Sequence, residues 1–255
     1  MFCIKKEQVR AFEIARFPLF EEMMLTHISS NFNGHALVLG KKNISRLIRH
    51  GYNCAREYGF ETRYEVCLYI DLMIMLGHGF DTDPQLAWSQ EFLRHENKKD
   101  TPERIDQLYQ RAVGFMEILM GPEQFFPVQQ FQQLITFSWE EMERDFSGSK
   151  DINAILKNFW PAKFDSISPQ AIRELIRTGI LKAREYGFFT ETHITFYVVL
   201  MFLLGHRFDN DLQYPWIINI LTGPEYKEEF YKAASLHFTV QHLLQNLLEA
   251  GIKIN

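Results

Sequence analysis

Residues 55–60 of the chain read Ala-Arg-Glu-Tyr-Gly-Phe, and residues 183–188 read the same six letters. The two stretches lie 128 positions apart, and this spacing holds without a gap from 47–78 in one copy to 175–206 in the other. Further matches at the same spacing pair Gly51 with Gly179, Phe80-Asp81 with Phe208-Asp209, Asp83 with Asp211, and Trp88 with Trp216. A single register kept over so many identities predicts a tandem duplication.

Two copies of this size account for the whole chain. The first copy covers residues 1–120 and the second covers 121–255, with Gly121-Pro122 as a natural break between them. We expect the copies to pack together as one globular unit. Outside the constant register the flanks match after small shifts, in which 20–23 resembles 139–142 and 102–112 resembles 224–234.

Both copies are predicted to be all-α, with about five helices per copy, because the apolar residues fall at helical spacing. A helix is expected over about Ile44 to Tyr58, with Gly59 as the left-handed residue that ends it. Thr62 and Glu65 then form a capping box for an apolar helix. No segment shows the strict alternation of a β-strand.

The bulk composition argues against several classes of protein. The formal net charge is −5 and the sequence pI is about 6.0, so the chain lacks the basic field with which nucleic-acid binders attract phosphate. The three cysteines, Cys3, Cys54 and Cys67, are too few for a disulfide framework. We therefore expect no nucleic-acid partner and a reducing, cytoplasmic location.

Two strongly apolar segments, residues 66–76 and 194–204, raise the question of a membrane. Each is about half of the roughly 20 residues that a membrane-spanning helix needs. The N-terminal residues have no apolar core of the kind found in a signal peptide. The two segments are thus predicted to be buried core helices, and no membrane insertion is expected.

A histidine and two aspartates recur in both copies and form the most obvious chemical candidate. Such a set can bind a metal ion or perform acid–base chemistry. The same spacing is also what a helix end followed by a helix start requires, since aspartate before proline is an N-cap. The structural interpretation is favoured. The residues are His78, Asp81 and Asp83 in the first copy, and His206, Asp209 and Asp211 in the second.

Three charged residues are candidates for partner binding: Asp71, Arg56 and Arg184. Asp71 interrupts an apolar helix at a position where the second copy has Val199. A buried carboxylate needs a partner, for which His50 and Arg56 are candidates. The repeated Arg-Glu pair is either a binding surface or, as we favour, a buried ion pair that fixes how two helices meet.

Recognisable catalytic motifs are missing from the sequence. There is no Gly-x-Ser-x-Gly, no phosphate-binding glycine loop and no His-Glu-x-x-His. We therefore expect no enzyme, no cofactor and no bound metal. The alternative is an enzyme or metal-binding protein with a site between the two copies, built from His78, Asp81, His206 and Asp209.

The motif Ala-Arg-Glu-Tyr-Gly-Phe-x-Thr, followed by an apolar helix ending in Leu-Gly-His and then by Phe-Asp-x-Asp-Pro, resembles a known group of proteins. These are small α-helical proteins encoded beside bacterial type VI secretion effectors, their spike proteins and their adaptors. The resemblance covers most of the first copy and the middle of the second. Arg207 and Leu212 stand where the first copy has Gly79 and Pro84, so the turn there is expected to differ.

The resemblance implies a cytosolic protein that binds an effector or its adaptor, as an immunity protein or a chaperone-like factor. It implies no catalytic residues. The acidic charge agrees with this function, because it would favour a basic surface on the partner and speed the encounter.

Overall fold

The computed structural model describes residues 6–94, 100–121, 132, 134–136, 138, 141, 144 and 151–249, with side chains from Phe17 to Asn246. These residues form helices and turns, and none of them is in a β-strand. The predicted all-α class is therefore confirmed for the described part. No described helix is both long and apolar enough to cross a membrane. The expected match of 20–23 with 139–142 lies largely outside the described residues.

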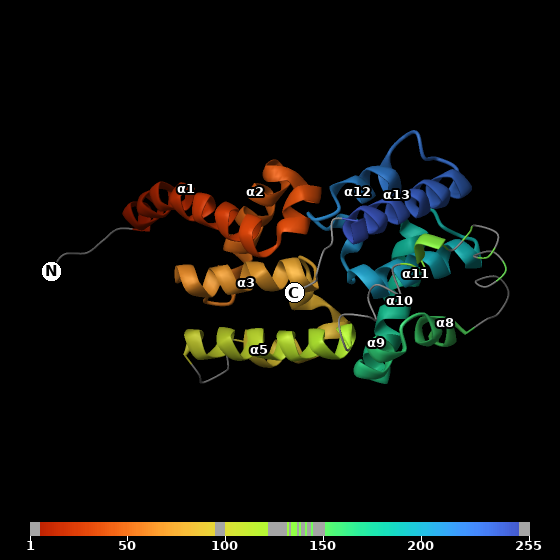
Figure 1. The fold of residues 1–255 in the computed structure, drawn as a ribbon, viewed down its shortest axis with the longest axis horizontal. Coiled ribbons are helices and arrows are strands. Elements are labelled where there is room, and N and C mark those ends of the chain that lie inside the picture. Colours follow the sequence, from red (N-terminus) through yellow and green to blue (C-terminus); the bar gives the residue numbers. More distant parts are fainter. Residues whose placement is uncertain are drawn as a thin grey trace.

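The first half occupies the left of Figure 1, and the second half occupies the right. The first half contains α1 (Lys6–Asn31), α2 (Asn33–Glu57), α3 (Arg63–Leu76), η1 (Phe80–Thr82), η2 (Pro84–Ser89), α4 (Gln90–Leu93) and α5 (Thr101–Met120). The second half contains α8 (Ile152–Phe159), α9 (Pro161–Ser166), α10 (Pro169–Glu185), α11 (Glu191–Leu204), η4 (Phe208–Asn210), α12 (Pro215–Thr222) and α13 (Glu229–Glu249).

Several helix ends form where the sequence predicts them. Gly59 and Gly187 have φ of 79° and 83°, a conformation that glycine adopts without steric penalty. The Thr62 and Glu65 side chains form the capping box at the start of α3. Ser168 caps α10, which opens with a proline.

The 128-residue register continues further than the sequence comparison indicated. The bounds of α3 and η1, shifted by 128, are the bounds of α11 and η4. The same shift carries the start of α5 onto the start of α13, so the shifted match of 102–112 with 224–234 is wrong. The buried positions also correspond, in that Arg104, Ile105, Leu108, Ala112 and Phe115 pair with Lys232, Ala233, Leu236, Val240 and Leu243.

The apolar helices α3 and α11 form the centre of each half. α2 packs on α3, and α10 packs on α11. Tyr69 and Phe80 have ring centroids 5.0 Å apart, and the equivalent rings of Tyr197 and Phe208 are 4.9 Å apart. All four side chains are fully buried. The predicted burial of the two apolar segments is thus confirmed.

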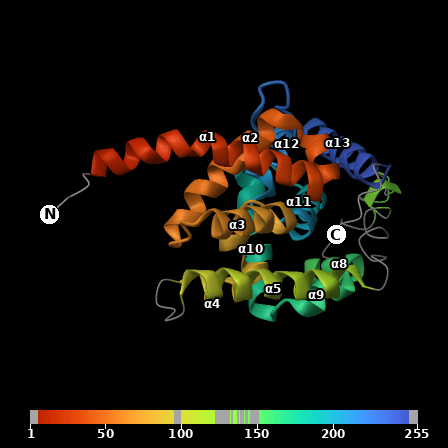
Figure 2. The same ribbon diagram turned by 60° about the vertical axis from the view of Figure 1, so that its left-hand side comes forward.

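Several helices of the first half contact helices of the second. η2 of the first half contacts α10, α5 lies beside α9, and α2 contacts α13. The contact of α5 with α9 can be followed in both ribbon views (Figure 1, Figure 2).

The halves differ after η1 and η4. The first half continues as the 3-10 helix η2, whereas the second forms a turn and then α12. Trp88 and Trp216 lie in these divergent segments, and both are partly buried against the hydrophobic core. The Trp88 ring lies 5.8 Å from that of Phe115 on α5.

Candidate functional sites

The repeated aspartates Asp83 and Asp211 join the two halves. Oδ1 of Asp83 accepts a hydrogen bond from the backbone N–H of Gln85 at 2.8 Å, as predicted for an N-cap. Its Oδ2 accepts a hydrogen bond from the backbone N–H of His206 at 2.9 Å. This bond crosses the contact between the two halves, which we call the seam. Asp211 repeats this arrangement with Gln213 N–H at 2.8 Å and His78 N–H at 2.9 Å. Each carboxylate therefore caps its own turn and binds the backbone N–H two residues beyond the end of the opposite apolar helix.

The glutamines that follow these aspartates reinforce the exchange. The Gln85 side-chain amide donates to the carbonyl of Met201 on α11 at 3.2 Å. The Gln213 amide donates to the carbonyl of Met73 on α3 at 3.0 Å. The first bond runs from the first half to the second, and the other runs from the second half to the first. The seam thus contains four reciprocal hydrogen bonds to groups at the ends of α3 and α11.

The imidazoles of His78 and His206 lie against the same carboxylates. Nδ1 of His78 is 3.1 Å from Oδ1 of Asp211, and Nδ1 of His206 is 3.5 Å from Oδ2 of Asp83. The first contact is close enough for an ion pair, although it is not aligned as a hydrogen bond. Burial opposes ionisation of Asp83, but the contacts with His206 and the backbone N–H groups outweigh it and lower the pKa of this carboxyl.

Asp81 and Asp209 are engaged elsewhere, each within its own half. Asp81 Oδ2 accepts hydrogen bonds from the hydroxyls of Tyr58 at 2.9 Å and Tyr69 at 3.2 Å. Asp209 accepts from the Tyr186 hydroxyl at 2.9 Å and from Lys182 Nζ at 3.0 Å. The histidines contact Asp211 and Asp83, so the alternative site built from His78, Asp81, His206 and Asp209 is not formed by direct contacts among those four residues.

The backbone N–H groups just before α3 and α11 are bound by a glutamate in both halves, but from different positions in the sequence. Glu65, on α3, accepts the backbone N–H groups of Glu61 and Thr62 at 2.9 and 2.8 Å. In the second half the carboxylate comes from Glu229 on α13, which accepts from Phe189 and Thr190 at 2.9 and 2.7 Å. The position equivalent to Glu65 is then His193. Its Nδ1 lies 2.6 Å from Oε1 of Glu229. Equivalent backbone N–H groups are therefore bound by a carboxylate in both halves, but that carboxylate comes from α3 in the first half and from α13 in the second.

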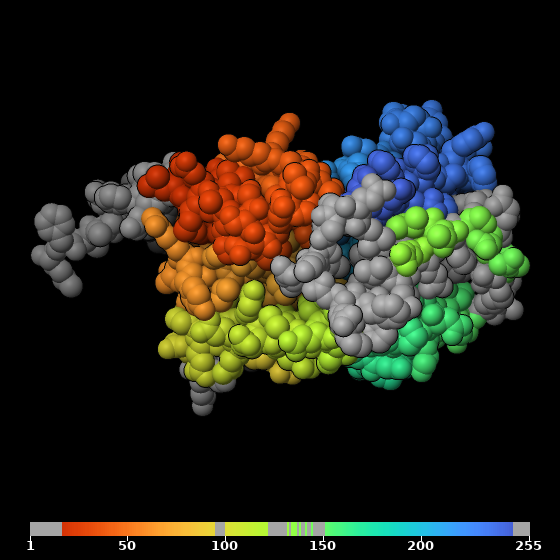
Figure 3. All heavy atoms as spheres, in the orientation of Figure 1, coloured from red at the N-terminus to blue at the C-terminus, as the bar shows by residue number. Residues whose placement is uncertain are grey.

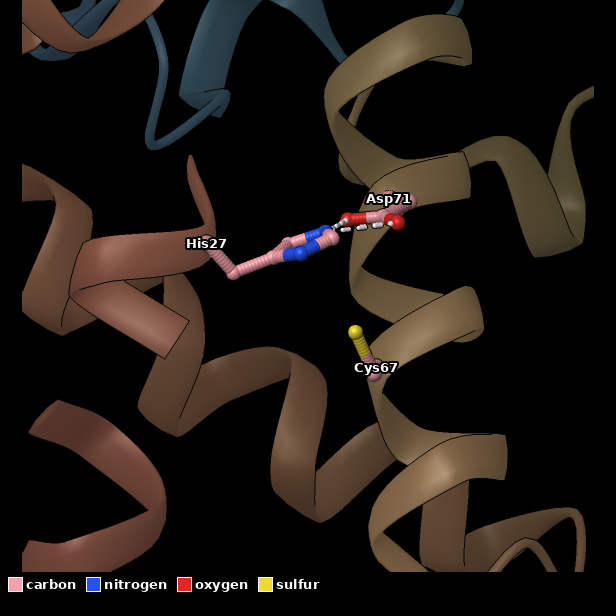
Figure 4. Close-up of side chains that lie close together, drawn as sticks. All are labelled: His27, Cys67 and Asp71. Carbon is pink, nitrogen blue, oxygen red and sulfur yellow. Dashed lines mark hydrogen bonds and ion pairs between the residues drawn. The ribbon is translucent and has the colours of Figure 1, made fainter. Parts of the chain in front are cut away.

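Asp71 lies in a cluster with His27 and Cys67 in the first half (Figure 4). Nε2 of His27, on α1, is 2.9 Å from both carboxylate oxygens of Asp71. The partner of Asp71 is therefore His27, and the expected pairing with His50 or Arg56 is wrong. Cys67 lies one helical turn before Asp71, and ligand atoms of the three residues are all within 4.8 Å of one another.

The charges in this cluster follow from burial. Desolvation raises the pKa of Asp71, while the neighbouring His27 opposes this shift. Burial, with a smaller contribution from the Asp71 charge, raises the pKa of Cys67 to about 12, so this cysteine is a thiol near neutral pH. Asn31 lies 3.1 Å from Nδ1 of His27 and fixes the other side of the ring.

The two arginine candidates are not at this cluster. Arg56 contacts Tyr52, with its guanidinium 5.5 Å from the ring centre and one nitrogen 3.3 Å from the hydroxyl. Arg184 is exposed, as is Glu185 beside it. The exposure of this second pair shows that the expected buried Arg-Glu ion pair is wrong there.

The second half also presents an exposed aromatic face that the sequence comparison missed. We define it by four side chains with exposed fractions of 71, 50, 63 and 71%: Phe189, Phe230, Tyr231 and Phe238. The 128-residue register places exposed, non-aromatic residues at the equivalent positions of the first half: Glu61, Pro102, Glu103 and Gln110. The sequence contains this difference, which becomes visible when the spacing of 128 residues is extended into α13.

These aromatic residues belong to one region of the surface. The backbone N–H of Phe189 donates to Glu229, the first residue of α13. The rings of Phe230 and Tyr231 are 5.8 Å apart, and Phe238 follows Tyr231 by two helical turns on the same side of α13. α13 runs along the surface at the upper right of Figure 3, in blue.

Comparison of the chain with protein-family models, curated proteins and solved structures gives no match.

Proposed function

We propose that the chain is a tandem duplication of a helical unit with about five helices per copy, and that it acts by binding another protein, without catalysis. The first part is supported by the contacts that recur at 128 residues, above all the reciprocal capping by Asp83 and Asp211. This capping also gives the repeated polar residues a structural role in both halves.

The exposed aromatic face is the observation that carries the binding function. Aromatic side chains provide much of the binding energy at protein interfaces, and contiguous exposed apolar patches mark such interfaces. The equivalent surface of the first half shows that the fold does not require these residues, since Glu61, Glu103 and Gln110 occupy the same positions. The four aromatic side chains therefore lie at positions where the first half has proline or polar residues.

The charge around the face favours a partner of complementary charge. Near it in sequence, the exposed acidic residues are Glu185, Glu191, Glu225 and Glu228, against the exposed basic residues Arg184 and Lys227. The excess is negative, as is the net charge of the whole chain. We infer a partner that presents an apolar centre with a basic rim, since complementary potentials steer encounter.

The resemblance to proteins encoded beside type VI secretion effectors suggests which proteins have that chemistry. The partner would be a secreted effector or its adaptor in the cytoplasm of the producing or target bacterium. Binding would neutralise the effector, as an immunity protein does, or hold it for export, as a chaperone does. The same aromatic face serves either function.

The proposal is tested by measuring partner affinity in matched variants. A partner captured from the native host is purified, and its Kd is measured for the unmodified chain, Tyr231→Ser and Phe238→Ser. Truncating an aromatic hot spot costs about 2 kcal/mol or more, so each variant should bind roughly 30-fold or more weakly. Association should also slow as salt increases.

Leu37→Ser and Ile118→Ser are the controls, because these exposed apolar residues lie in the first half. Both should keep an affinity within about threefold of the unmodified chain. A partner whose affinity is unchanged by the two aromatic substitutions would show that the binding face lies elsewhere.

A further inference from the structure

The cluster of His27, Cys67 and Asp71 has the composition of a transition-metal site. It brings together one imidazole, one thiol and one carboxylate from two helices. This combination of nitrogen, sulfur and oxygen donors suits zinc or cobalt, whereas magnesium and calcium prefer oxygen alone.

The helical geometry explains how these donors meet. Cys67 and Asp71 are four residues apart on α3, so both project from the same side of that helix. His27 approaches from α1, and Figure 4 shows its ring directed at the carboxylate. The side chain of Asp71 is 6% exposed and that of His27 is 29% exposed. The cluster is thus buried on the α3 side and reaches solvent beside the imidazole.

The distances are close to those that a tetrahedral ion requires. Zinc–ligand bonds of about 2.0–2.3 Å place neighbouring ligand atoms roughly 3.3–3.8 Å apart. Here the imidazole and carboxylate atoms are 2.9 Å apart, and the full set lies within 4.8 Å. Small side-chain rotations therefore suffice to surround an ion.

The site also has an outer partner for the imidazole. Metal-bound histidines usually hold their second ring nitrogen in a hydrogen bond. Asn31 lies 3.1 Å from Nδ1 of His27, and its side-chain amide also contacts the backbone carbonyl of residue 27 at 2.9 Å. The amide nitrogen of Asn31 thus holds the ring from its Nδ1 side, and Nε2 is directed at Asp71.

We propose that His27, Cys67 and Asp71 bind one zinc-like divalent ion, with the fourth position open toward solvent. The Cys67 thiol gives its proton to solvent as the sulfur–metal bond forms. The second half cannot form an equivalent site, because Thr195 and Val199 replace the cysteine and the aspartate. This site therefore holds one ion per chain. This inference does not depend on the aromatic face.

Cobalt(II) is the probe that tests the site. Titration of the metal-free full chain should saturate at one equivalent, with thiolate-to-cobalt charge-transfer absorption that zinc abolishes by displacement. Cys67→Ser should eliminate that absorption. His27→Gln and Asp71→Asn should each weaken binding by at least about tenfold.

Cys54→Ser is the matched control, because Sγ of Cys54 lies 3.6 Å from Nε2 of His50 and forms a second cysteine–histidine pair. This variant should bind cobalt like the unmodified chain. Zinc should also raise the Tm of the unmodified chain and Cys54→Ser, and have little effect on folded Cys67→Ser. A chain without thiolate–cobalt absorption, or one that keeps it in Cys67→Ser, overturns the proposal.

Discussion

The two halves of the molecule agree in their central helices and differ at the aromatic face and at the His27 cluster. α3 and α11 have matching bounds, buried aromatic pairs and reciprocal caps. The first half carries a cluster of His27, Cys67 and Asp71 that the second lacks. The second half carries the aromatic face. Packing constrains a core tightly, whereas exposed positions can change with little effect on the fold. The functions of this chain are therefore expected where the halves diverge.

The largest effect should come from removing a carboxylate that both halves share. Asp83→Ala and Asp211→Ala each leave two backbone N–H groups without their partner, one local and one across the seam. Loss of an N-cap and of a buried acceptor should lower the free energy of unfolding by about 2–4 kcal/mol, similarly in both variants. Urea denaturation measures this change.

The exposed Asp165 provides the control for the aspartates. It pairs with Lys157 at 3.0 Å on the surface, and Asp165→Ala should change stability by less than about 1 kcal/mol. A large loss in Asp83→Ala with none in Asp211→Ala would break the equivalence of the two halves at the seam.

A smaller and graded effect is expected at the glycines where each pair of helices crosses. A Cβ at Gly51 would lie 2.6 Å from Ile70, and one at Gly179 would lie 2.8 Å from Val198. The resulting overpacking costs about 1–3 kcal/mol, partly offset by the better helix propensity of alanine. Gly51→Ala should therefore lower the Tm more than Gly179→Ala does.

Gly114 is the matched control within α5. A Cβ there meets no atom within 4 Å, so Gly114→Ala should raise stability, by up to about 1 kcal/mol. If all three substitutions behaved alike, close helix contact would not be the reason for Gly51 and Gly179.

An effect that depends on pH concerns the carboxylate that comes from α3 in the first half and from α13 in the second. Burial favours the neutral form of Glu229, but hydrogen bonds from Thr190, His193 and Phe189 outweigh it and lower the pKa to about 2. The pKa of Glu65 is lowered as well, by hydrogen bonds from Thr101, Thr62 and Glu61 that outweigh its burial. A lowered folded-state pKa contributes stability above the unfolded value of 4.5, which is lost as the pH falls toward 2.

Urea denaturation between pH 7 and pH 2 tests this contribution. Glu229→Gln should be less stable than the unmodified chain at pH 7, and the difference should shrink as the pH falls from 4.5 toward 2. Glu65→Gln should behave in the same direction. A stability difference that is independent of pH would show that the charged form of Glu229 is not what the hydrogen bonds stabilise.

The sequence predicts local features well because their causes are local. Gly59 ends a helix, Thr62 and Glu65 form a capping box, and Asp83 caps its own turn, all within a few residues. The second acceptor role of Asp83 depends on His206, which is 123 residues away, and spacing alone does not reveal it. The pairing of Asp71 with His27 likewise depends on how α1 packs on α3.

The aromatic face was missed for a different reason. Its signal is present in the sequence, as Glu103 and Gln110 against Tyr231 and Phe238, once the 128-residue register is continued. A chance resemblance between Pro102-Glu103 and Pro224-Glu225 favoured a shifted alignment that hid it. Arg104 donates to the carbonyl of Tyr58, and Lys232 donates to the carbonyl of Tyr186. These equivalent contacts support the alignment of α5 with α13 at a spacing of 128 residues.

Hydrogen exchange of the chain with and without its partner tests the central claim, that partner binding uses the face at which the second half departs from the first. We predict slower exchange on binding in peptides covering 186–192 and 229–240. The equivalent peptides, 58–64 and 101–112, should exchange at unchanged rates. Protection confined to the first-half peptides, or equal in both halves, would contradict the account.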